Sequence, residues 1–290
     1  MILILVIAVT HFQIRKALWT QSIGNSVTIV LSPHFDDAVL SLGGLLAKEK
    51  GHSVVATFFT GAVGDTTAEE SGTGAAIALT EWDKISGFSN SAEATPSRTE
   101  ENKAAVTDLG SSAINYGHFD TEYKKRADRE DEVLVTTIAG EIETLIKTFS
   151  GYPISVYGPA EFGDIITHPD HKTLHRAFVQ VSKKYAGDTR VHFFIYEDYP
   201  YVARFRAGTT TPLAEFLEKS NGVTLEESAL ALTRSDLVKK GLALSRYTSQ
   251  IRAFSILREH LVPDTLRFNS LRCRHALPPL PACEVVYKIW

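Results

Sequence analysis

Two short polar clusters, more than a hundred residues apart, carry the side chains of this sequence that are best suited to chemistry. They are residues 33–37 (PHFDD) and residues 168–171 (HPDH). In each cluster two of the polar residues stand three positions apart, so both can project from one face of a helical turn. Together the clusters offer imidazole nitrogens and carboxylate oxygens as ligands for a divalent metal. The residues that are not needed as ligands could act as acids or bases. That combination is typical of a hydrolytic zinc site.

Three of these residues form the candidate metal-ligand set: His34, Asp37 and His171. Two neutral imidazoles and one carboxylate leave a fourth position for water, which is the open arrangement that catalytic zinc needs. The same ligands accept Fe²⁺ or another divalent ion, so Zn²⁺ is the expected metal without being the only one possible.

The remaining residues of the clusters are candidates for proton transfer. Asp36 is the expected general base, with helix N-capping as the alternative, and spacing alone does not settle whether Asp36 or Asp37 binds the metal. His168 is placed to donate a hydrogen bond to an oxyanion or to act as an acid. Asp170 is expected to orient an imidazole, although a charge at a helix N-terminus explains it equally well.

The elements that position these clusters alternate between strand and helix, which predicts parallel βαβ units. Strands are expected over 27–31, 54–60, 112–116, 154–157, 191–196 and 284–290, and helices over 36–50, 97–109, 131–149, 169–185, 212–220 and 235–254. The predicted fold is a doubly wound, mostly parallel, Rossmann-like α/β sheet with helices on both faces and a C-terminal extension. Both clusters follow a predicted strand, where open α/β sheets bind ligands.

The stretch 61–96 is rich in Gly, Ser, Thr and Ala and is expected to be a long functional loop. The helix after it should begin with a capping box at Ser97 and Glu100. Arg98, in its first turn, could bind a substrate hydroxyl or anion, with an ordinary surface arginine as the alternative. Tyr196 opens a polar and aromatic cluster (196–201) that suits sugar binding as well as a packed strand end.

Composition and charge limit the classes of partner that this sequence suits. The net charge is −4 and no long basic block exists, which argues against nucleic acid as a partner. Residues 1–25 form an apolar segment of uncertain role, too short in its apolar part to be a clear membrane span. A secretion-related segment and an ordinary buried strand both fit it, so the compartment stays open, with the cytoplasm slightly favoured. Residues 26–290 are expected to be a single domain. Cys273 and Cys283 fit structural or free thiols, and a disulfide between them is possible.

The two clusters resemble those of the PIG-L/LmbE-like de-N-acetylases, a family of zinc hydrolases. His34 to Asp37 matches its His-x-Asp-Asp stretch and His168 to His171 its His-x-Asp-His stretch; weaker similarity extends over roughly 27–255. The resemblance implies metal ligation by His34, Asp37 and His171, with Asp36 as base and His168 as transition-state stabiliser. The chain departs from the family at Phe35, where Pro is usual, and at Ala38, where Glu is common.

The resulting hypothesis is a metal-dependent hydrolase that removes an N-acetyl or N-acyl group from an amino-sugar conjugate or a related small metabolite. Two alternatives stay open: a hydrolase of non-sugar amides or esters with the same metal chemistry, and a non-catalytic module that binds carbohydrate or metal. The sequence does not indicate an oligomeric state.

Overall fold

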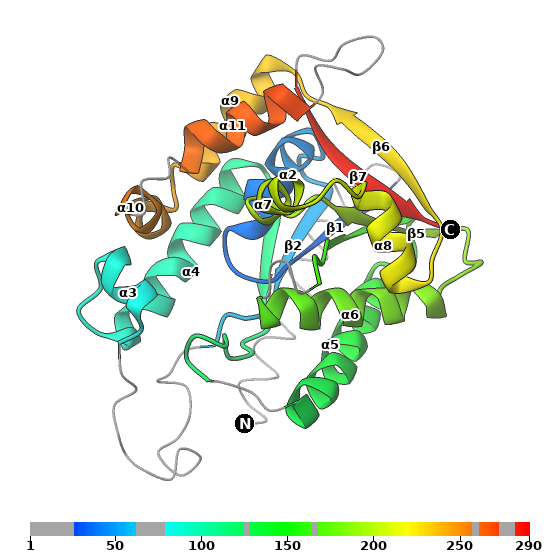
Figure 1. Cartoon of the computed structure of the whole chain (residues 1–290), viewed down its shortest axis with the longest axis horizontal. Coiled ribbons are helices and arrows are strands. Elements are labelled where there is room, and N and C mark those ends of the chain that lie inside the picture. Colours follow the sequence, from blue (N-terminus) through cyan, green and yellow to red (C-terminus); the bar gives the residue numbers. More distant parts are fainter. Residues whose placement is uncertain (1–25, 62–78, 125–127, 164–167, 257–260, 273–281) are drawn as a thin grey trace.

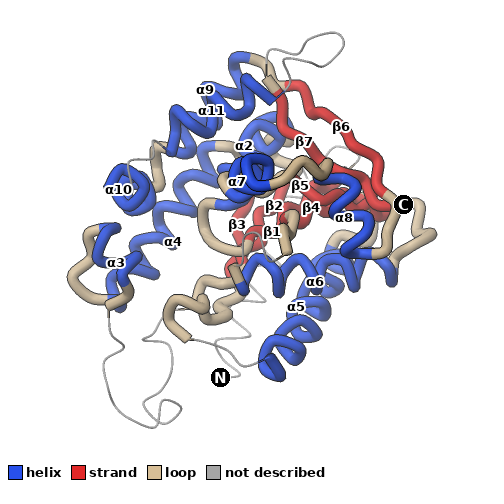
Figure 2. Tube along the Cα trace, viewed as in Figure 1, coloured by secondary structure: helices blue, strands red, loops and turns tan. Residues whose placement is uncertain are grey.

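One mostly parallel sheet organises the protein (Figures 1 and 2). The computed structural model describes residues 26–61, 79–124, 128–163, 168–256, 261–272 and 282–290. Within these residues the sheet has seven strands in the order β3-β2-β1-β4-β5-β7-β6. The strands are β1 (Val27–Ser32), β2 (Ser53–Thr57), β3 (Ser112–Asn115), β4 (Ile154–Pro159), β5 (Val191–Tyr196), β6 (Leu225–Ala231) and β7 (Cys283–Ile289). Strands β1 to β5 pair in parallel, whereas β7 runs antiparallel to both β5 and β6.

Helices cover both faces of this sheet (Figure 1). They are α2 (Asp37–Lys48), α3 (Glu81–Ser86), α4 (Ser91–Asp108), α5 (Asp128–Thr148), α6 (Pro169–Lys184), α7 (Tyr201–Gly208), α8 (Leu213–Asn221), α9 (Arg234–Leu244), α10 (Thr248–Ile256) and α11 (Leu261–Arg272). Side chains alternate along β1: Ile29 and Leu31 belong to the core beneath α5 and α6, and Val30 to the core beneath α2 and α4. Because both faces are buried, the central strands consist largely of apolar residues. The predicted doubly wound α/β fold is confirmed.

The strand order reverses at β1. From β1 the chain adds β2 and β3 on one side, and then β4 and β5 on the other. A crevice forms where neighbouring connections leave in opposite directions, and ligands of doubly wound folds bind there, beyond the carboxyl ends of the strands. The first polar cluster follows β1, and the second lies after β4, at the start of α6. The topology therefore brings the clusters together.

Several boundaries differ from those expected. Helix α4 begins at Ser91, not at 97, because the side chain of Asn90 accepts the Glu93 N–H at 3.0 Å; Pro96 lies inside the helix and the capping box at Ser97 is wrong. The expected helix 235–254 is two helices, α9 and α10. Four elements have no counterpart among the predicted ones: α3, α7, α11 and β6. Strand β6 pairs only at the edge of the sheet and has the polar sequence LEESALA, which lacks the β-branched residues of a buried strand.

Helix α2, which begins at Asp37, is tied to the C-terminal part of the chain by a buried ion pair. The helix is kinked at Leu42 (φ −125°, ψ 22°). Beyond the kink, Glu284 of β7 accepts the N–H groups of Gly44 and Leu45, both at 2.8 Å. The ammonium of Lys240, on α9, lies 2.7 Å from the same carboxylate and is completely buried. The carboxylate therefore caps the second half of α2 while Lys240 balances its charge.

Substituting Lys240→Met should lower the free energy of unfolding by about 3–5 kcal/mol, because it leaves the buried Glu284 carboxylate without its counter-charge. Lys239→Met, at the exposed neighbouring position of α9, is the matched control and should change stability by about 0.5 kcal/mol or less. Urea unfolding of the three proteins measures both values. Equal losses in the two variants would contradict this account of the ion pair.

The ends of the chain are only partly described. Residues 1–25 lie outside the described residues, so the domain division at 25 stays a prediction. Cys283 is buried and disulfide-bonded, while Cys273, the only other cysteine of the sequence, lies outside the described residues. No helix in the described part of the chain is long and apolar enough to cross a membrane.

Candidate metal centre and active site

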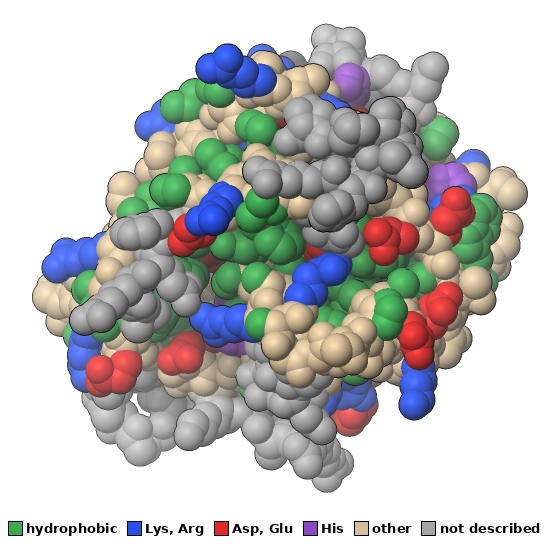
Figure 3. Space-filling model, turned by 45° about the horizontal axis from the view of Figure 1, so that its top comes forward, with side chains coloured by type: hydrophobic (Ala, Val, Ile, Leu, Met, Phe, Trp, Pro, Cys, Tyr) green, Lys and Arg blue, Asp and Glu red, His purple; other side chains and the backbone are tan. Residues whose placement is uncertain are grey.

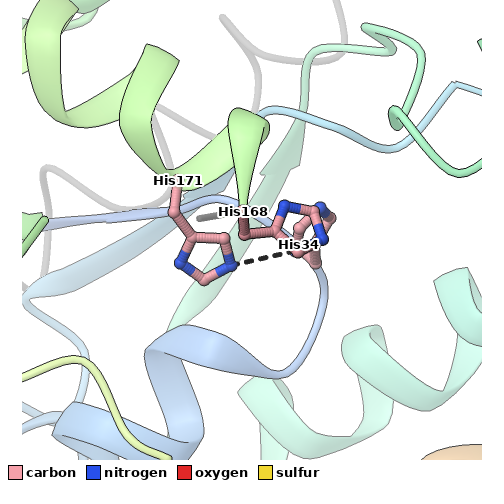
Figure 4. A group of neighbouring side chains, drawn as sticks. All are labelled: His34, His168 and His171. Atoms are coloured by element: carbon pink, nitrogen blue, oxygen red, sulfur yellow. Dashed lines mark hydrogen bonds between the residues drawn. The ribbon is translucent and has the colours of Figure 1, made fainter. Parts of the chain in front are cut away.

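The imidazoles of His34, His168 and His171 converge at the switch point of the sheet (Figure 4). His34 lies in the turn between β1 and α2, His168 is the N-cap residue of α6, and His171 lies in the first turn of α6. The ring centroids of His34 and His168 are 4.7 Å apart, and those of His34 and His171 are 5.1 Å apart. Two segments 134 residues apart in the sequence thus form one site.

Three donor atoms form a nearly regular triangle. His34 Nδ1 lies 3.3 Å from Asp37 Oδ2 and 3.3 Å from His171 Nε2, and His171 Nε2 lies 3.4 Å from Asp37 Oδ2. In a tetrahedral zinc site with zinc–ligand bonds of about 2.0–2.1 Å, neighbouring ligand atoms lie about 3.3–3.4 Å apart. An octahedral Mg²⁺ ion would need adjacent ligands about 2.9 Å apart. The triangle therefore fits one face of a tetrahedral site.

Each imidazole of this triangle has a carboxylate behind it. His34 Nε2 lies 3.1 Å from Asp170 Oδ2, and His171 Nδ1 lies 2.5 Å from Asp198 Oδ2. The Asp170 carboxylate is in turn held by the N–H and hydroxyl of Thr121, at 3.0 and 3.2 Å. Carboxylates in this position fix the tautomer and orientation of an imidazole so that its other nitrogen can bind a metal. The imidazole that faces the Asp170 carboxylate is therefore that of His34.

The electrostatics of the site favour a cation. Burial alone would lower the pKa of His34, but Asp120, Asp170 and Asp37 together raise it well above its ordinary value. Burial likewise opposes the rise at His171, which Asp37 and Asp198 cause. The pKa of Asp37 shifts in the opposite direction. Burial would raise it, but the positive charges of His171 and His34, with hydrogen bonds from His34, hold it far below its usual range. The site therefore contains several buried carboxylates. Without another cation, protonation of the two imidazoles is what balances their negative charge.

Asp36 differs from its neighbour Asp37. Burial, followed by repulsion from Asp37, raises the pKa of the Asp36 carboxyl to about 7, while His34 and Arg98 act in the opposite direction. Asp36 is the N-cap residue of α2, yet its side chain makes no capping hydrogen bond. The capping alternative for this residue is therefore wrong. Asp36 also lines the cavity in front of the triangle.

His168 lies next to the triangle, and one of its ring nitrogens is within 4.8 Å of ring nitrogens of His34 and His171. Its Nδ1 is buried, accepts or donates no hydrogen bond, and lies 4.0 Å from Asp170 Oδ2. Burial and the neighbouring imidazoles of His34 and His171 lower the pKa of His168 to about 3. Its ring lines the cavity on one side and a second hollow, next to α5 and α6, on the other.

A cavity of about 310 Å³ opens in front of these groups, at the lower end of the range of roughly 300–1,000 Å³ typical of small-molecule sites. Its wall includes Asp36, His168 and the histidine of the first cluster. It also includes aromatic residues of α3 and α10, where Trp82 packs edge-on against Phe254 at 5.6 Å. On the face shown in Figure 3, acidic and basic side chains are interspersed. A small ligand with both polar and apolar parts fits such a cavity.

The two expected substrate residues have different surroundings. Arg98 lines the cavity, but its guanidinium is held by Asp83 at 3.0 Å and by the hydroxyl of Tyr123 at 3.1 Å, and only its Nε is without a partner. Tyr196 is completely buried and its hydroxyl donates to the carbonyl of Leu31 at 3.0 Å. Tyr196 therefore cannot contact a ligand in this cavity, and its packed-strand alternative is correct. Tyr201, five residues further on, lines the cavity instead.

Two carboxylates of the site were not among the expected site residues. Asp198 supports His171, and Asp120 Oδ2 lies 3.5 Å from His34 Nε2, with its pKa raised to about 6 mainly by burial. Both follow predicted strands, β5 and β3, at the same edge of the sheet. That position was the available signal, but it applies equally to every polar residue of these loops.

The part of the chain that carries both polar clusters matches a known protein family. Residues 29–182, more than half of the chain, match the family described as GlcNAc-PI de-N-acetylase (PIG-L). A comparison with curated protein sequences gave no significant match.

Three solved structures share the fold. A deacetylase of the antimicrobial A40926 pseudoaglycone is 21% identical, with a TM-score of 0.69, over 92% of this chain and 98% of the other. The zinc-inhibited form of a teicoplanin deacetylase is 21% identical, with a TM-score of 0.70, over 91% and 97%. A 4-carboxy-2-hydroxymuconate hydratase from Pseudomonas putida is 18% identical, with a TM-score of 0.54, over 92% and 97%. At these identities the likeness concerns the fold alone. The family match, which covers both the first cluster and the second, shows that this chain belongs to the PIG-L family.

Proposed function

We propose that this protein is a metal-dependent hydrolase that removes the N-acetyl group from an amino-sugar conjugate. The observation that carries the proposal is the triangle of donor atoms from His34, Asp37 and His171, with edges of 3.3–3.4 Å. Membership of a family described by its N-acetylglucosamine substrate supports the amide bond as the target.

Zn²⁺ is the proposed metal, because its tetrahedral bond lengths fit the triangle and because nitrogen and oxygen donors suit it. Fe²⁺ and other divalent ions accept the same donors. One structural relative is known in a zinc-inhibited form, so loading with excess zinc has to be compared with other metals. A bound divalent ion would polarise the amide carbonyl and lower the pKa of a coordinated water.

The roles of the other residues follow from their positions. Asp36 lines the cavity beside the triangle, with a pKa of about 7, and can take a proton from the attacking water and return it to the departing amine. His168 lines the same cavity and can donate a hydrogen bond to the oxyanion as it develops. Asp170 and Asp198 hold the two ligand imidazoles in the orientation that directs His34 Nδ1 and His171 Nε2 to the metal.

The aromatic part of the cavity wall would hold the non-reacting part of the substrate. Trp82 and Phe254 present apolar ring surface there, and the Trp82 indole N–H is held by Gln250 at 3.1 Å. Aromatic rings that pack against the apolar face of a sugar, with polar groups at its hydroxyls, suit an amino-sugar conjugate better than a simple N-acyl amine. Arg98, fixed by Asp83, adds positive charge to the wall.

A substrate panel tests the proposed function. Metal-free protein is reconstituted separately with Zn²⁺, Fe²⁺, Co²⁺ and Ni²⁺ and assayed for acetate release from N-acetylglucosamine, its glycosides, simple N-acetyl amines and acetate esters. We expect release from N-acetylglucosamine derivatives, with metal required. Release only from amines or esters would indicate the alternative hydrolase. Sugar binding without acetate release under every metal would indicate a non-catalytic module.

Substituting Asp198→Asn should weaken metal binding by roughly 10–100-fold, because an amide holds the His171 imidazole less firmly than a carboxylate does. Competition with a chelating dye measures the affinity. Asp188→Asn, in the turn before β5, removes a carboxylate remote from the site and serves as the control. Unchanged metal affinity in Asp198→Asn would contradict the assignment of Asp198 to His171.

A further inference from the structure

Tyr247 reaches the active-site turn from a part of the chain that lies beyond the family match at residues 29–182. It lies between α9 and α10 and is 1% exposed. Its hydroxyl oxygen lies 3.0 Å from the carbonyl oxygen of Phe35, the residue before Asp36. It also lies 3.0 Å from the Oδ1 position of Asn102, a completely buried residue of α4. A tyrosine 212 residues away in the sequence thus contacts the backbone of the catalytic turn.

The number of protons available decides which group is the donor in each of these hydrogen bonds. A tyrosine hydroxyl has one proton and can donate it to one acceptor. The Phe35 carbonyl has no donor of its own to offer, so it needs that proton. The oxygen and nitrogen of an Asn amide are interchangeable in assignment, and turning the Asn102 amide lets its N–H donate to the Tyr247 oxygen. Its carbonyl then accepts from the Thr57 hydroxyl, at the 3.5 Å separation seen there. Each group in this buried chain then has a partner of the right kind.

The backbone around Asp36 decides where its carboxyl points. The side chain makes no capping hydrogen bond, in contrast to Asp37, whose Oδ2 accepts the His34 N–H at 2.8 Å. The Asp36 carbonyl is held by the Leu40 N–H at 2.9 Å within α2. The hydrogen bond from Tyr247 to Phe35 holds the peptide on the other side. The backbone is therefore fixed on both sides of Asp36, and this turn directs a carboxyl that makes no capping hydrogen bond to the helix.

We propose that Tyr247, oriented by Asn102, is a positioning residue that holds the Phe35–Asp36 peptide and thereby aims the Asp36 carboxyl into the cavity. The inference rests on the proposed function, in which Asp36 is the base. It gives the C-terminal part of the chain a role in the reaction without contact with substrate or metal.

Tyr247→Phe tests this by removing one hydroxyl and keeping the buried ring. We expect kcat to fall by roughly 10–100-fold, as small misplacements of catalytic groups do, with KM and metal content unchanged. In an Asp36→Ala background, Tyr247→Phe should cause no further loss, because a residue that acts through Asp36 has nothing left to position. Tyr287→Phe, which removes an equally buried hydroxyl bonded to Glu197 at 2.8 Å, is the control and should keep the wild-type kcat.

Other outcomes overturn the proposal in distinguishable ways. An unchanged kcat in Tyr247→Phe, or an equal further loss in the Asp36→Ala background, removes the positioning role and leaves the proposed function intact. Asn102→Ala, which removes the group that orients the hydroxyl, replaces Tyr247→Phe if the latter does not fold. If the wild-type protein hydrolyses nothing in the panel, the proposed function fails, and crystal structures of wild type and Tyr247→Phe decide the positioning claim. An unmoved Phe35–Asp36 peptide would overturn it.

Discussion

Asp36→Ala should lower kcat by roughly 10²-fold or more while the metal stays bound. The carboxyl lines the cavity beside the donor triangle but belongs to none of its edges, so its removal takes away the proton acceptor and leaves the donors in place. Steady-state kinetics with the best substrate of the panel, together with metal analysis of the same preparation, measures both effects.

Asp36→Asn is the matched variant, since it keeps the size of the side chain and abolishes only its basicity. We expect Asp36→Asn and Asp36→Ala to be similarly slow. A fully active Asp36→Ala enzyme would end the assignment of Asp36 as the base. Loss of metal along with activity would instead place Asp36 among the ligands.

His171→Ala should abolish metal binding, from about one equivalent in the wild type to almost none under metal-limited conditions. The substitution removes one corner of the triangle and also leaves the buried Asp198 carboxylate without its imidazole. Elemental analysis after dialysis against a chelator, followed by reloading with one equivalent of Zn²⁺, gives the stoichiometry.

His175→Ala is a demanding control, because His175 lies one turn further along α6 and is equally buried. Its nitrogens bond to the Pro159 carbonyl at 2.7 Å and to Asn221 at 3.0 Å, away from the triangle. The His175→Ala variant should therefore lose stability but still bind its metal. If wild type and His171→Ala both bind no metal after reloading, the triangle is structural, and a non-catalytic carbohydrate-binding module becomes the better account of the protein.

Much of the fold could be predicted because its central strands are buried on both faces. A run such as VTIVL in β1 has few other stable environments, and the helix that follows it carries its own start signals. Edge strand β6 and the short helices α3 and α7 have no comparable pattern, since their positions depend on packing against elements far away in the sequence. The same holds for Pro96, which local rules place before a helix and which the Asn90 cap places inside one.

The residues of the site also fall into those that local sequence indicates and those that only packing brings together. Residue types and spacing sufficed to single out His34, Asp37, His168 and His171, because ligands three apart on a turn share a face whatever surrounds them. The sequence by itself thus determined the chemistry on offer and the edge of the sheet where it lies. Only the tertiary structure decided which groups support it: Asp198 behind His171, Tyr247 against Phe35, and Tyr196 buried away from the cavity. Those contacts join segments far apart in the chain, and their geometry exists only once the sheet and its helices have packed.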